Sequence, residues 1–266
     1  MKLYDNQLTG TIPTEVGHLI KLKRIDLDVN GLLGTIPSEI GNCEQLEFLW
    51  LNNNNLNGTI PEELYGLTAL QKLYMEDLNL TGMISKSIGN LVNLEVLNMN
   101  SNSLTGTIPP NIKNCTKLRS IELNDNNLTG SLPSEITHLT NLEILYLSGN
   151  EFGSSIPSEW AEMQNLTALA ISSSNITGRI PSEIYNLTKL QYLLLDRNEL
   201  TGTIPSQVGQ MKNLTHLYLY DNQLDGQLPS ALGGLSNLKE LVLNQNKFTG
   251  PVPTSFRNMT GLGEYR

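Results

Sequence analysis

The chain has 266 residues, of which 26 are acidic and 17 are basic, and its formal net charge at pH 7 is −9. This negative charge argues against nucleic acid or an anionic membrane surface as the main partner, because both would repel an acidic protein. No stretch approaches the roughly 20 apolar residues that a membrane-spanning helix needs, and the N-terminus (MKLYDNQLTG) lacks the apolar region of a signal peptide. We therefore expect no membrane contact by this segment itself.

One residue pattern, L-x-x-L-x-L-x-x-N-x-L-T-G-x-I-P, returns every 24 residues without insertion or deletion, and residues 190–205 show it most clearly. Only Leu78 and Ser174 interrupt the series of asparagines in this pattern. A fixed period of this length indicates a solenoid, in which each repeat forms one coil that stacks on its neighbours. The asparagines are Asn6, Asn30, Asn54, Asn102, Asn126, Asn150, Asn198, Asn222 and Asn246.

The first element of each repeat is predicted to be a short strand over L-x-x-L-x-L. Alternate leucines of such a strand point inward, and the residues between them point outward. Strands of successive repeats should pair in parallel about 4.8 Å apart and form a curved sheet. The first inward leucines are Leu22, Leu46, Leu70, Leu94, Leu118, Leu142, Leu166, Leu190, Leu214 and Leu238.

The rest of each repeat is predicted to form tight turns. An asparagine amide can satisfy both donors and acceptors of the turn backbone, so stacked asparagines should form a ladder with weak rungs at Leu78 and Ser174. The glycine that follows allows a bend. The segments after I-P, such as residues 38–43 and 206–211, are too short for an α-helix, so we expect 3₁₀ turns there.

Two repeats are irregular. The repeat around Leu78 also loses its proline, because Ser85 stands in that position. Trp160 occupies a column that holds valine or isoleucine in repeats such as those of Val16, Ile40, Ile88 and Ile112, and we expect it to be an enlarged core residue. Cys43 and Cys115 share another column and should be buried. They lie three coils apart, roughly 14 Å at strand spacing, which is too far for a disulfide.

The L-x-G-x-I-P signature resembles the plant-type leucine-rich repeat of receptor-like kinases, receptor-like proteins and polygalacturonase-inhibiting proteins, and the resemblance covers the whole chain. It implies an α/β repeat solenoid, a leucine-rich repeat horseshoe with a parallel β-sheet on the concave face and short 3₁₀ or loop segments on the convex face. We expect residues 1–266 to form a single domain of about eleven repeats. The family usually carries cysteine-paired caps and none is visible here, so we expect a fragment of a longer protein.

The resemblance also implies a non-catalytic ectodomain that recognises a protein or peptide ligand. It implies a location on the extracellular side of the plasma membrane, or secretion, and a parent that can include a kinase domain. Some peptide receptors of the family hold a terminal carboxylate with an R-x-R pair on the concave face, and this sequence has no such pair.

Two other functions compete with this interpretation. One is a secreted inhibitor of extracellular enzymes, to which the repeats are also similar. The other is an ice-binding surface like that of leucine-rich-repeat antifreeze proteins. Such a surface would need T-x-T pairs, whose two threonines lie about 6.7 Å apart along a strand, on adjacent coils. Thr9/Thr11, Thr105/Thr107 and Thr201/Thr203 fit that spacing, but residues such as Leu33, Asn57 and Met83 break the rows between them.

The sequence holds no recognised catalytic motif. There is no H-E-x-x-H, no G-x-S-x-G, no phosphate-binding G-x-x-x-x-G-K-S/T and no kinase signature. His18 and His138 lie five coils apart, so they cannot share a metal ion. We expect this segment to have no enzymatic activity, no cofactor and no metal site.

Nine N-x-S/T sequons make the chain a candidate glycoprotein. Several follow from the repeat consensus itself, which contains N-L-T, so they can be by-products of the fold. None occupies an outward position of the predicted strands, so sugars would leave that face bare. The candidate asparagines are Asn57, Asn79, Asn114, Asn127, Asn165, Asn175, Asn186, Asn213 and Asn258.

Outward strand positions carry two groups of aromatic residues, and the scaffold does not dictate these positions. Exposed aromatics often anchor interfaces, although aromatics also favour strands for their own sake. We expect the second group to be the main contact with a ligand and the first to be secondary. The first group is Phe48, Trp50 and Tyr74, and the second is Tyr192, His216, Tyr218 and Tyr220.

Overall fold

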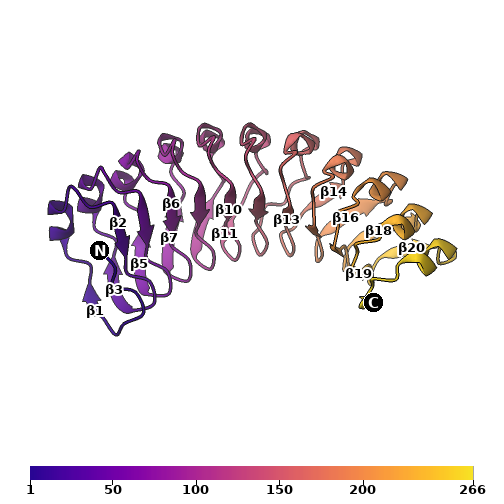
Figure 1. The fold of residues 1–266 in the computed structure, drawn as a ribbon, viewed down its shortest axis with the longest axis horizontal. Coiled ribbons are helices and arrows are strands. Elements are labelled where there is room, and N and C mark those ends of the chain that lie inside the picture. Colours follow the sequence, from indigo (N-terminus) through magenta and orange to yellow (C-terminus); the bar gives the residue numbers. More distant parts are fainter. Residues whose placement is uncertain (266) are drawn as a thin grey trace. The chain divides into compact units, whose positions relative to one another are not determined.

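The protein is represented by a computed structural model that describes residues 1–265. The chain divides into two compact units, Met1–Thr129 and Gly130–Arg266. In both units every repeat has a strand on one side of the coil and a 3₁₀ helix on the other (Figure 1). The predicted parallel-sheet repeats with 3₁₀ turns are confirmed, whereas the single-domain organisation stays a prediction.

A main sheet of strands two or three residues long runs through each unit. Neighbouring strands are parallel and offset by one 24-residue repeat, so that Arg24 lies opposite Phe48 and Tyr192 lies opposite His216. The strands of the first unit are β2 (Arg24–Asp26), β4 (Phe48–Trp50), β6 (Lys72–Tyr74), β8 (Val96–Asn98) and β10 (Ser120–Glu122). Those of the second are β12 (Ile144–Tyr146), β13 (Ala168–Ala170), β15 (Tyr192–Leu194), β17 (His216–Tyr218), β19 (Glu240–Val242) and β21 (Glu264–Tyr265).

The side of each coil opposite the main sheet carries a five-residue 3₁₀ helix. A proline precedes each of these helices except η4, where Ser85 takes its place and its hydroxyl caps the backbone N–H of Ser87. The first unit contains η1 (Thr14–His18), η2 (Ser38–Asn42), η3 (Glu62–Gly66), η4 (Lys86–Asn90) and η5 (Pro110–Asn114). The second contains η6 (Ser134–His138), η7 (Ser158–Glu162), η8 (Ser182–Asn186), η9 (Ser206–Gln210), η10 (Ser230–Gly234) and η11 (Thr254–Asn258).

A second parallel sheet follows the asparagine turn in each unit, and the sequence interpretation had only a bend there. Its strands pair with an offset of 22 residues, two short of the repeat, so that Thr59 lies opposite Thr81. In the first unit it consists of β1 (Thr9–Thr11), β3 (Gly31–Thr35), β5 (Asn55–Thr59), β7 (Asn79–Met83), β9 (Ser103–Gly106) and β11 (Asn127–Leu128). In the second it consists of β14 (Thr177–Arg179), β16 (Glu199–Gly202), β18 (Gln223–Gln227) and β20 (Lys247–Thr249).

Glycine is required in this second sheet for two reasons. Gly34 has a φ of +76°, a left-handed conformation that side chains disfavour. A Cβ atom added there would also lie 2.9 Å from the methyl carbon of Thr11 in the preceding coil. The threonine methyl therefore occupies the space that the missing side chain leaves, and this contact stacks one coil on the next.

The predicted asparagine ladder is confirmed. The side-chain nitrogen of Asn54 donates to the carbonyl oxygens of Leu27, Leu51 and Asn52 at distances of 2.9–3.1 Å. Its side-chain oxygen accepts the backbone N–H of Leu32 at 3.0 Å. One amide thus satisfies backbone groups of two successive coils, as buried turns require.

Ser174 makes a poorer rung, as predicted. Its hydroxyl lies 2.9 Å from the carbonyl oxygen of Ser172 and 3.2 Å from that of Leu147, and it accepts the backbone N–H of Asn150 at 3.4 Å. A hydroxyl has one proton where an amide has two, so this rung cannot donate to as many carbonyls.

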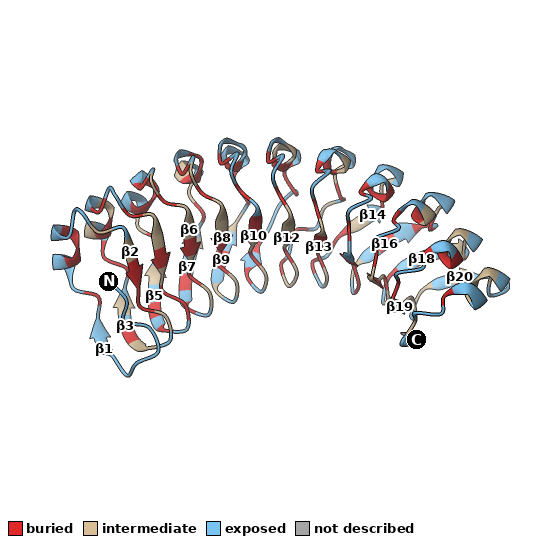
Figure 2. Cartoon of the chain, in the orientation of Figure 1, coloured by how far each residue is buried: buried red, intermediate tan, exposed pale blue. Residues whose placement is uncertain are grey.

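The core lies between the main sheet and the opposite side of each coil, where the inward leucines are buried, apart from the half-buried Leu22 of the first coil (Figure 2). Trp160 is fully buried, and its indole nitrogen donates to the carbonyl oxygen of Pro133 at 3.1 Å, which confirms the enlarged core position. Cys43 and Cys115 are buried and free, as predicted. Burial raises the pKa of the Cys115 thiol to about 12. Within residues 1–265, no helix is long and apolar enough to cross a bilayer.

Candidate functional site

The first aromatic group, which we call the tryptophan patch, consists of Phe48 and Trp50 on β4 and Tyr74 on β6. The ring centroids of Phe48 and Trp50 are 5.4 Å apart, those of Trp50 and Tyr74 are 5.9 Å apart, and both pairs are stacked within 11° of parallel. All three side chains are half-buried. The sheet register accounts for this stacking, because Trp50 and Tyr74 are direct partners in neighbouring strands.

The tryptophan patch carries its own cation, which the sequence interpretation missed. The guanidinium carbon of Arg24 lies 4.0 Å from the ring centroid of Trp50. A terminal nitrogen of Arg24 is also 2.9 Å from a carboxylate oxygen of Asp26, which is only 5% exposed. A cation over a ring and beside a carboxylate stabilises the sheet. Side chains of the first unit therefore cover much of this patch, although the buried Nε of Arg24 has no hydrogen-bond partner among the described residues.

Carboxylates beyond Tyr74 are also held by neighbouring side chains. The amide of Asn98 donates to Glu76 at 3.0 Å, and the hydroxyl of Ser120 donates to Glu122 at 2.8 Å. Burial, and then the charge of Glu122, raise the pKa of Tyr74. This side of the patch resembles an internal polar network more than an open binding surface.

The second aromatic group, which we call the tyrosine patch, consists of Tyr192 on β15, His216 and Tyr218 on β17, and Tyr220 just after β17. The rings of Tyr192 and His216 are stacked, with centroids 4.8 Å apart and planes within 16° of parallel. Tyr218 meets the imidazole edge-on at 6.2 Å and 73°. Tyr192 is 38% exposed, and the other three are half-buried. These ring contacts join Tyr192, His216 and Tyr218, three of the four residues that the sequence placed in one group.

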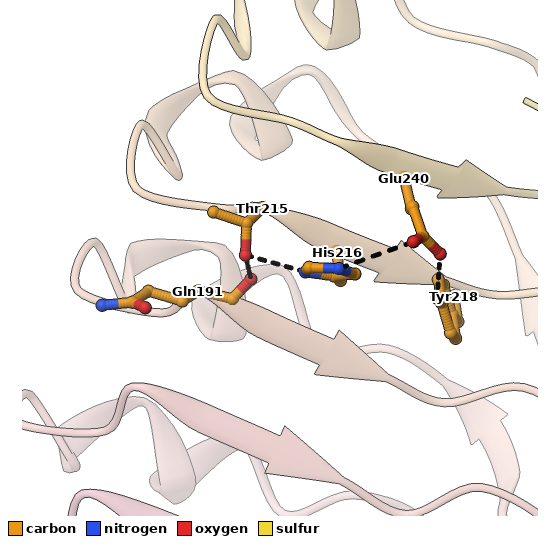
Figure 3. Close-up of polar contacts among 5 residues, drawn as sticks. All are labelled: Gln191, Thr215, His216, Tyr218 and Glu240. Carbon is orange, nitrogen blue, oxygen red and sulfur yellow. Dashed lines mark hydrogen bonds and ion pairs between the residues drawn. The ribbon is translucent and has the colours of Figure 1, made fainter. Parts of the chain in front are cut away.

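Polar contacts fix the orientation of His216 (Figure 3). The hydroxyl of Thr215 donates to the carbonyl oxygen of Gln191 at 2.9 Å. Its single proton is thereby used, so its oxygen must accept the proton on Nδ1 of His216, which lies 2.9 Å away. Nε2 then faces Oε1 of Glu240 at a distance of 3.8 Å.

Glu240 is the second residue that the sequence interpretation missed. Its other oxygen accepts a hydrogen bond from the hydroxyl of Tyr218. This bond, followed by burial and the negative charge, raises the pKa of Tyr218 to about 12, so the hydroxyl remains a donor at neutral pH. Glu240 is the register partner of His216 in the next strand, and that adjacency was the available signal in the sequence.

Tyr220 lies at the edge of the tyrosine patch. Burial, and then Asp196, raise its pKa. Asp196 is 6% exposed and accepts a hydrogen bond from the hydroxyl of Ser172 at 2.6 Å. The guanidinium of Arg197 lies 5.3 Å from the Tyr220 ring centroid. This edge is therefore polar and already has a cation.

All nine candidate glycosylation asparagines are exposed, and none lies in a strand of the main sheet. The side-chain nitrogens of Asn165 and Asn213 donate to carbonyl oxygens at 2.8 Å. Attachment of a sugar replaces only one of the two amide protons, so this bond is compatible with glycosylation. Use of the sequons stays a prediction.

The threonine pairs lie in the second sheet or at its edge, since Thr107 and Thr203 directly follow β9 and β16, and the register of this sheet weighs against the ice-binding alternative. Thr11 lies opposite Leu33 rather than opposite the equivalent Thr35, because the offset is 22 residues. The pairs are therefore staggered between coils instead of forming rectangular rows. Within the described part of the chain, no group of three or more His, Cys, Asp or Glu side chains is placed to hold a metal ion.

Comparisons with known proteins agree with this architecture. Leucine-rich repeat family profiles match residues 92–152 and 190–248, and also residues 21–43 and 45–67. The structure of a plant peptide hormone receptor, RGFR1 in complex with RGF2, is 33% identical over 99% of this chain, with a TM-score of 0.89. The ectodomain of the Arabidopsis receptor kinase HAESA, in complex with an extended IDA peptide hormone, is 32% identical over 100% of this chain, with a TM-score of 0.90.

The chain spans less than half of these two plant ectodomains, 46% of each. A leucine-rich repeat protein of Leptospira interrogans is 31% identical, with a TM-score of 0.80, and the match covers 99% of this chain and 70% of that one. No curated protein shows a significant sequence match. The similarity therefore extends along all of this chain but not along all of the plant receptors.

Proposed function

Because this chain belongs to the leucine-rich repeat family, we propose that it is a non-catalytic domain that binds a protein or peptide through the tyrosine patch. We assign it to the ligand-recognition ectodomain of a receptor-like kinase or receptor-like protein. The proposal places the domain outside the cell, with sugars on some of the nine sequons. The similar plant ectodomains were solved with peptide hormones bound, which supports a peptide as the ligand.

The observation that carries the proposal is the stacked pair of Tyr192 and His216, with Tyr192 38% exposed on the outward face of the main sheet. Tyrosine offers apolar area and a hydroxyl with few rotatable bonds, so it loses little entropy on contact. A sheet holds these rings in place more rigidly than a loop would. The tryptophan patch is a weaker candidate because Arg24 already covers Trp50.

A displayed library of random dodecapeptides tests this function. Peptides enriched on the 266-residue chain are synthesised and measured by calorimetry against two variants, Tyr192→Ala and Gln210→Ala. Gln210 is exposed in η9, on the side of the coil opposite the main sheet, so its replacement should change nothing. Tyr192→Ala should weaken binding by about thirtyfold, the loss of one hot-spot residue of roughly 2 kcal/mol.

Equal affinities for both variants would show that the peptides bind elsewhere. Failure of the library to yield any peptide that depends on Tyr192 would overturn the proposed function. Unfolding curves of the two variants serve as the control for folding, since neither side chain lies in the leucine core.

A further inference from the structure

The tyrosine patch contains an accessible carboxylate whose charge is not balanced within residues 1–265. The side chain of Glu240 is 43% exposed. Among the ion pairs of the described residues, its partner is His216, at 3.8 Å and only when the imidazole is protonated. Arg197 lies over the ring of Tyr220 instead. A fixed and uncompensated carboxylate beside aromatic rings attracts cations.

The tryptophan patch shows how the main sheet of this chain accommodates a cation. The guanidinium of Arg24 lies over the ring of Trp50 and pairs with Asp26 at 2.9 Å. Ring and carboxylate come from neighbouring strands, β4 and β2, on the same outward face. The tyrosine patch has the same two components, Tyr218 on β17 and Glu240 on β19, but no arginine of the described chain is paired with them.

We propose that the tyrosine patch binds a lysine or arginine side chain of a polypeptide ligand, with Glu240 as the ion-pair partner. The inference rests on the proposed function, since the cation belongs to the polypeptide that the patch recognises. The ring of Tyr218 supplies the aromatic surface beside the carboxylate, and Tyr192 supplies apolar contact to the neighbouring residue of the ligand. A guanidinium or ammonium thereby takes the place that Arg24 fills in the tryptophan patch.

The site is organised before the ligand arrives. The hydroxyl of Tyr218 holds one carboxylate oxygen of Glu240, and the other oxygen remains available to the ligand. Thr215 and the stacked ring of Tyr192 fix the imidazole beside it. Groups that are already oriented lose little conformational entropy on binding, so more of the ion-pair energy appears as affinity.

The test extends the library experiment with a double-mutant cycle. In each enriched peptide that depends on Tyr192, every lysine and arginine is replaced singly by glutamine. The same peptides are then measured on the Glu240→Gln variant, whose amide oxygen still accepts the Tyr218 hydroxyl. Glu199→Gln is the matched control, because Glu199 is an exposed carboxylate of the second sheet in the same unit.

At one basic position, replacement should lower the affinity for the wild-type chain about tenfold, which is roughly 1.4 kcal/mol. The same replacement should have little effect on Glu240→Gln, and Glu199→Gln should behave as wild type. The cation site would be overturned, and the proposed function left intact, by peptides that depend on Tyr192 but have no basic residue. Peptides that bind the Glu240→Gln variant as tightly as the wild-type chain would have the same consequence. Peptides that are indifferent to Tyr192→Ala would overturn both.

Discussion

The hydroxyl oxygen of Tyr65 accepts a hydrogen bond from the backbone N–H of Ser85, with the two atoms 3.4 Å apart. Ser85 stands where the other repeats have a proline, and proline has no N–H to donate. Tyr185 occupies the same column as Tyr65, five repeats later, but Pro205 stands in the position that corresponds to Ser85. The buried hydroxyl of Tyr185 has no hydrogen-bond partner among the described residues. The serine that replaces proline in the irregular repeat thus supplies the N–H that the buried hydroxyl of Tyr65 accepts.

This contrast predicts opposite effects of the same substitution in the two units. Tyr65→Phe should lower the free energy of unfolding by about 1 kcal/mol, because it removes a buried hydrogen bond. Tyr185→Phe should raise it by about 1 kcal/mol, because it removes a buried hydroxyl that has no partner. Urea unfolding of the two variants measures both changes, and losses of equal size would contradict the pairing of Tyr65 with Ser85.

The asparagine ladder predicts a second pair of unequal effects. Asn126→Ala should destabilise by about 2–3 kcal/mol, because a buried amide with several backbone partners is lost. Those partners include the carbonyl oxygen of Met99 and the backbone N–H of Leu104, both at 3.0 Å. Ser174→Ala should cost about 1 kcal/mol, since only a hydroxyl is removed. Denaturant unfolding compares the two, and equal losses would refute the ladder as a source of stability.

Much of the fold follows from the 24-residue period. The same period sets the offset between paired strands of the main sheet and the spacing of the inward leucines. The second sheet does not follow from it. Its 22-residue offset places the Thr11 methyl where a side chain on Gly34 would lie, and the pattern L-T-G alone indicates only a bend. The left-handed residue before each ladder position was also missed. Asp, Asn or Gly, which favour this conformation, fill about half of that column, but Val29 and Arg197, with φ of 50° and 54°, do not favour it and obscure the pattern.

The aromatic groups could be predicted because they occupy outward positions of a known register. The polar partners of these aromatic residues could not be predicted, because strand register does not set the direction of a long side chain. Arg24 lies across Trp50 rather than extending into solvent, and Tyr218 reaches Glu240 in the next strand. Such choices arise from local competition between ring stacking, ion pairing and hydration, and the repeat pattern carries no information about them.

The cation in the tryptophan patch predicts a stability effect in the first unit. Arg24→Ala should destabilise by about 1–2 kcal/mol, a value reduced from that of a fully buried pair because the arginine side chain is 37% exposed. Loss of the arginine leaves the nearly buried carboxylate of Asp26 without its cation. The control is Lys23→Ala, which breaks an exposed ion pair with Glu47 at 2.7 Å and should cost less than about 0.5 kcal/mol. Similar losses in thermal or urea unfolding would show that Arg24 adds nothing beyond an ordinary surface pair.

The tyrosine patch makes a prediction at alkaline pH. Tyrosine in an unfolded chain titrates near pH 10, whereas the pKa of Tyr218 in the folded chain is raised to about 12, chiefly by its hydrogen bond to Glu240. The folded chain therefore keeps a proton that the unfolded chain releases. The stabilising contribution of this hydroxyl is complete below pH 10 and is lost as the pH rises through 12.

Glu240→Gln tests the cause of that shift. The glutamine oxygen still accepts the hydroxyl proton, but it has no negative charge to oppose formation of the tyrosinate. The pKa of Tyr218 should therefore move down toward 10, and the loss of stability between pH 10 and 12 should become smaller. NMR titration of ¹³Cζ-labelled tyrosine, with the Tyr218 signal assigned by its absence in Tyr218→Phe, measures the change directly. Glu199→Gln should leave the titration unchanged. An unaltered titration in Glu240→Gln would mean that burial, rather than the carboxylate, holds the proton on Tyr218, and Glu240 would then lose its support as the charged group of the patch.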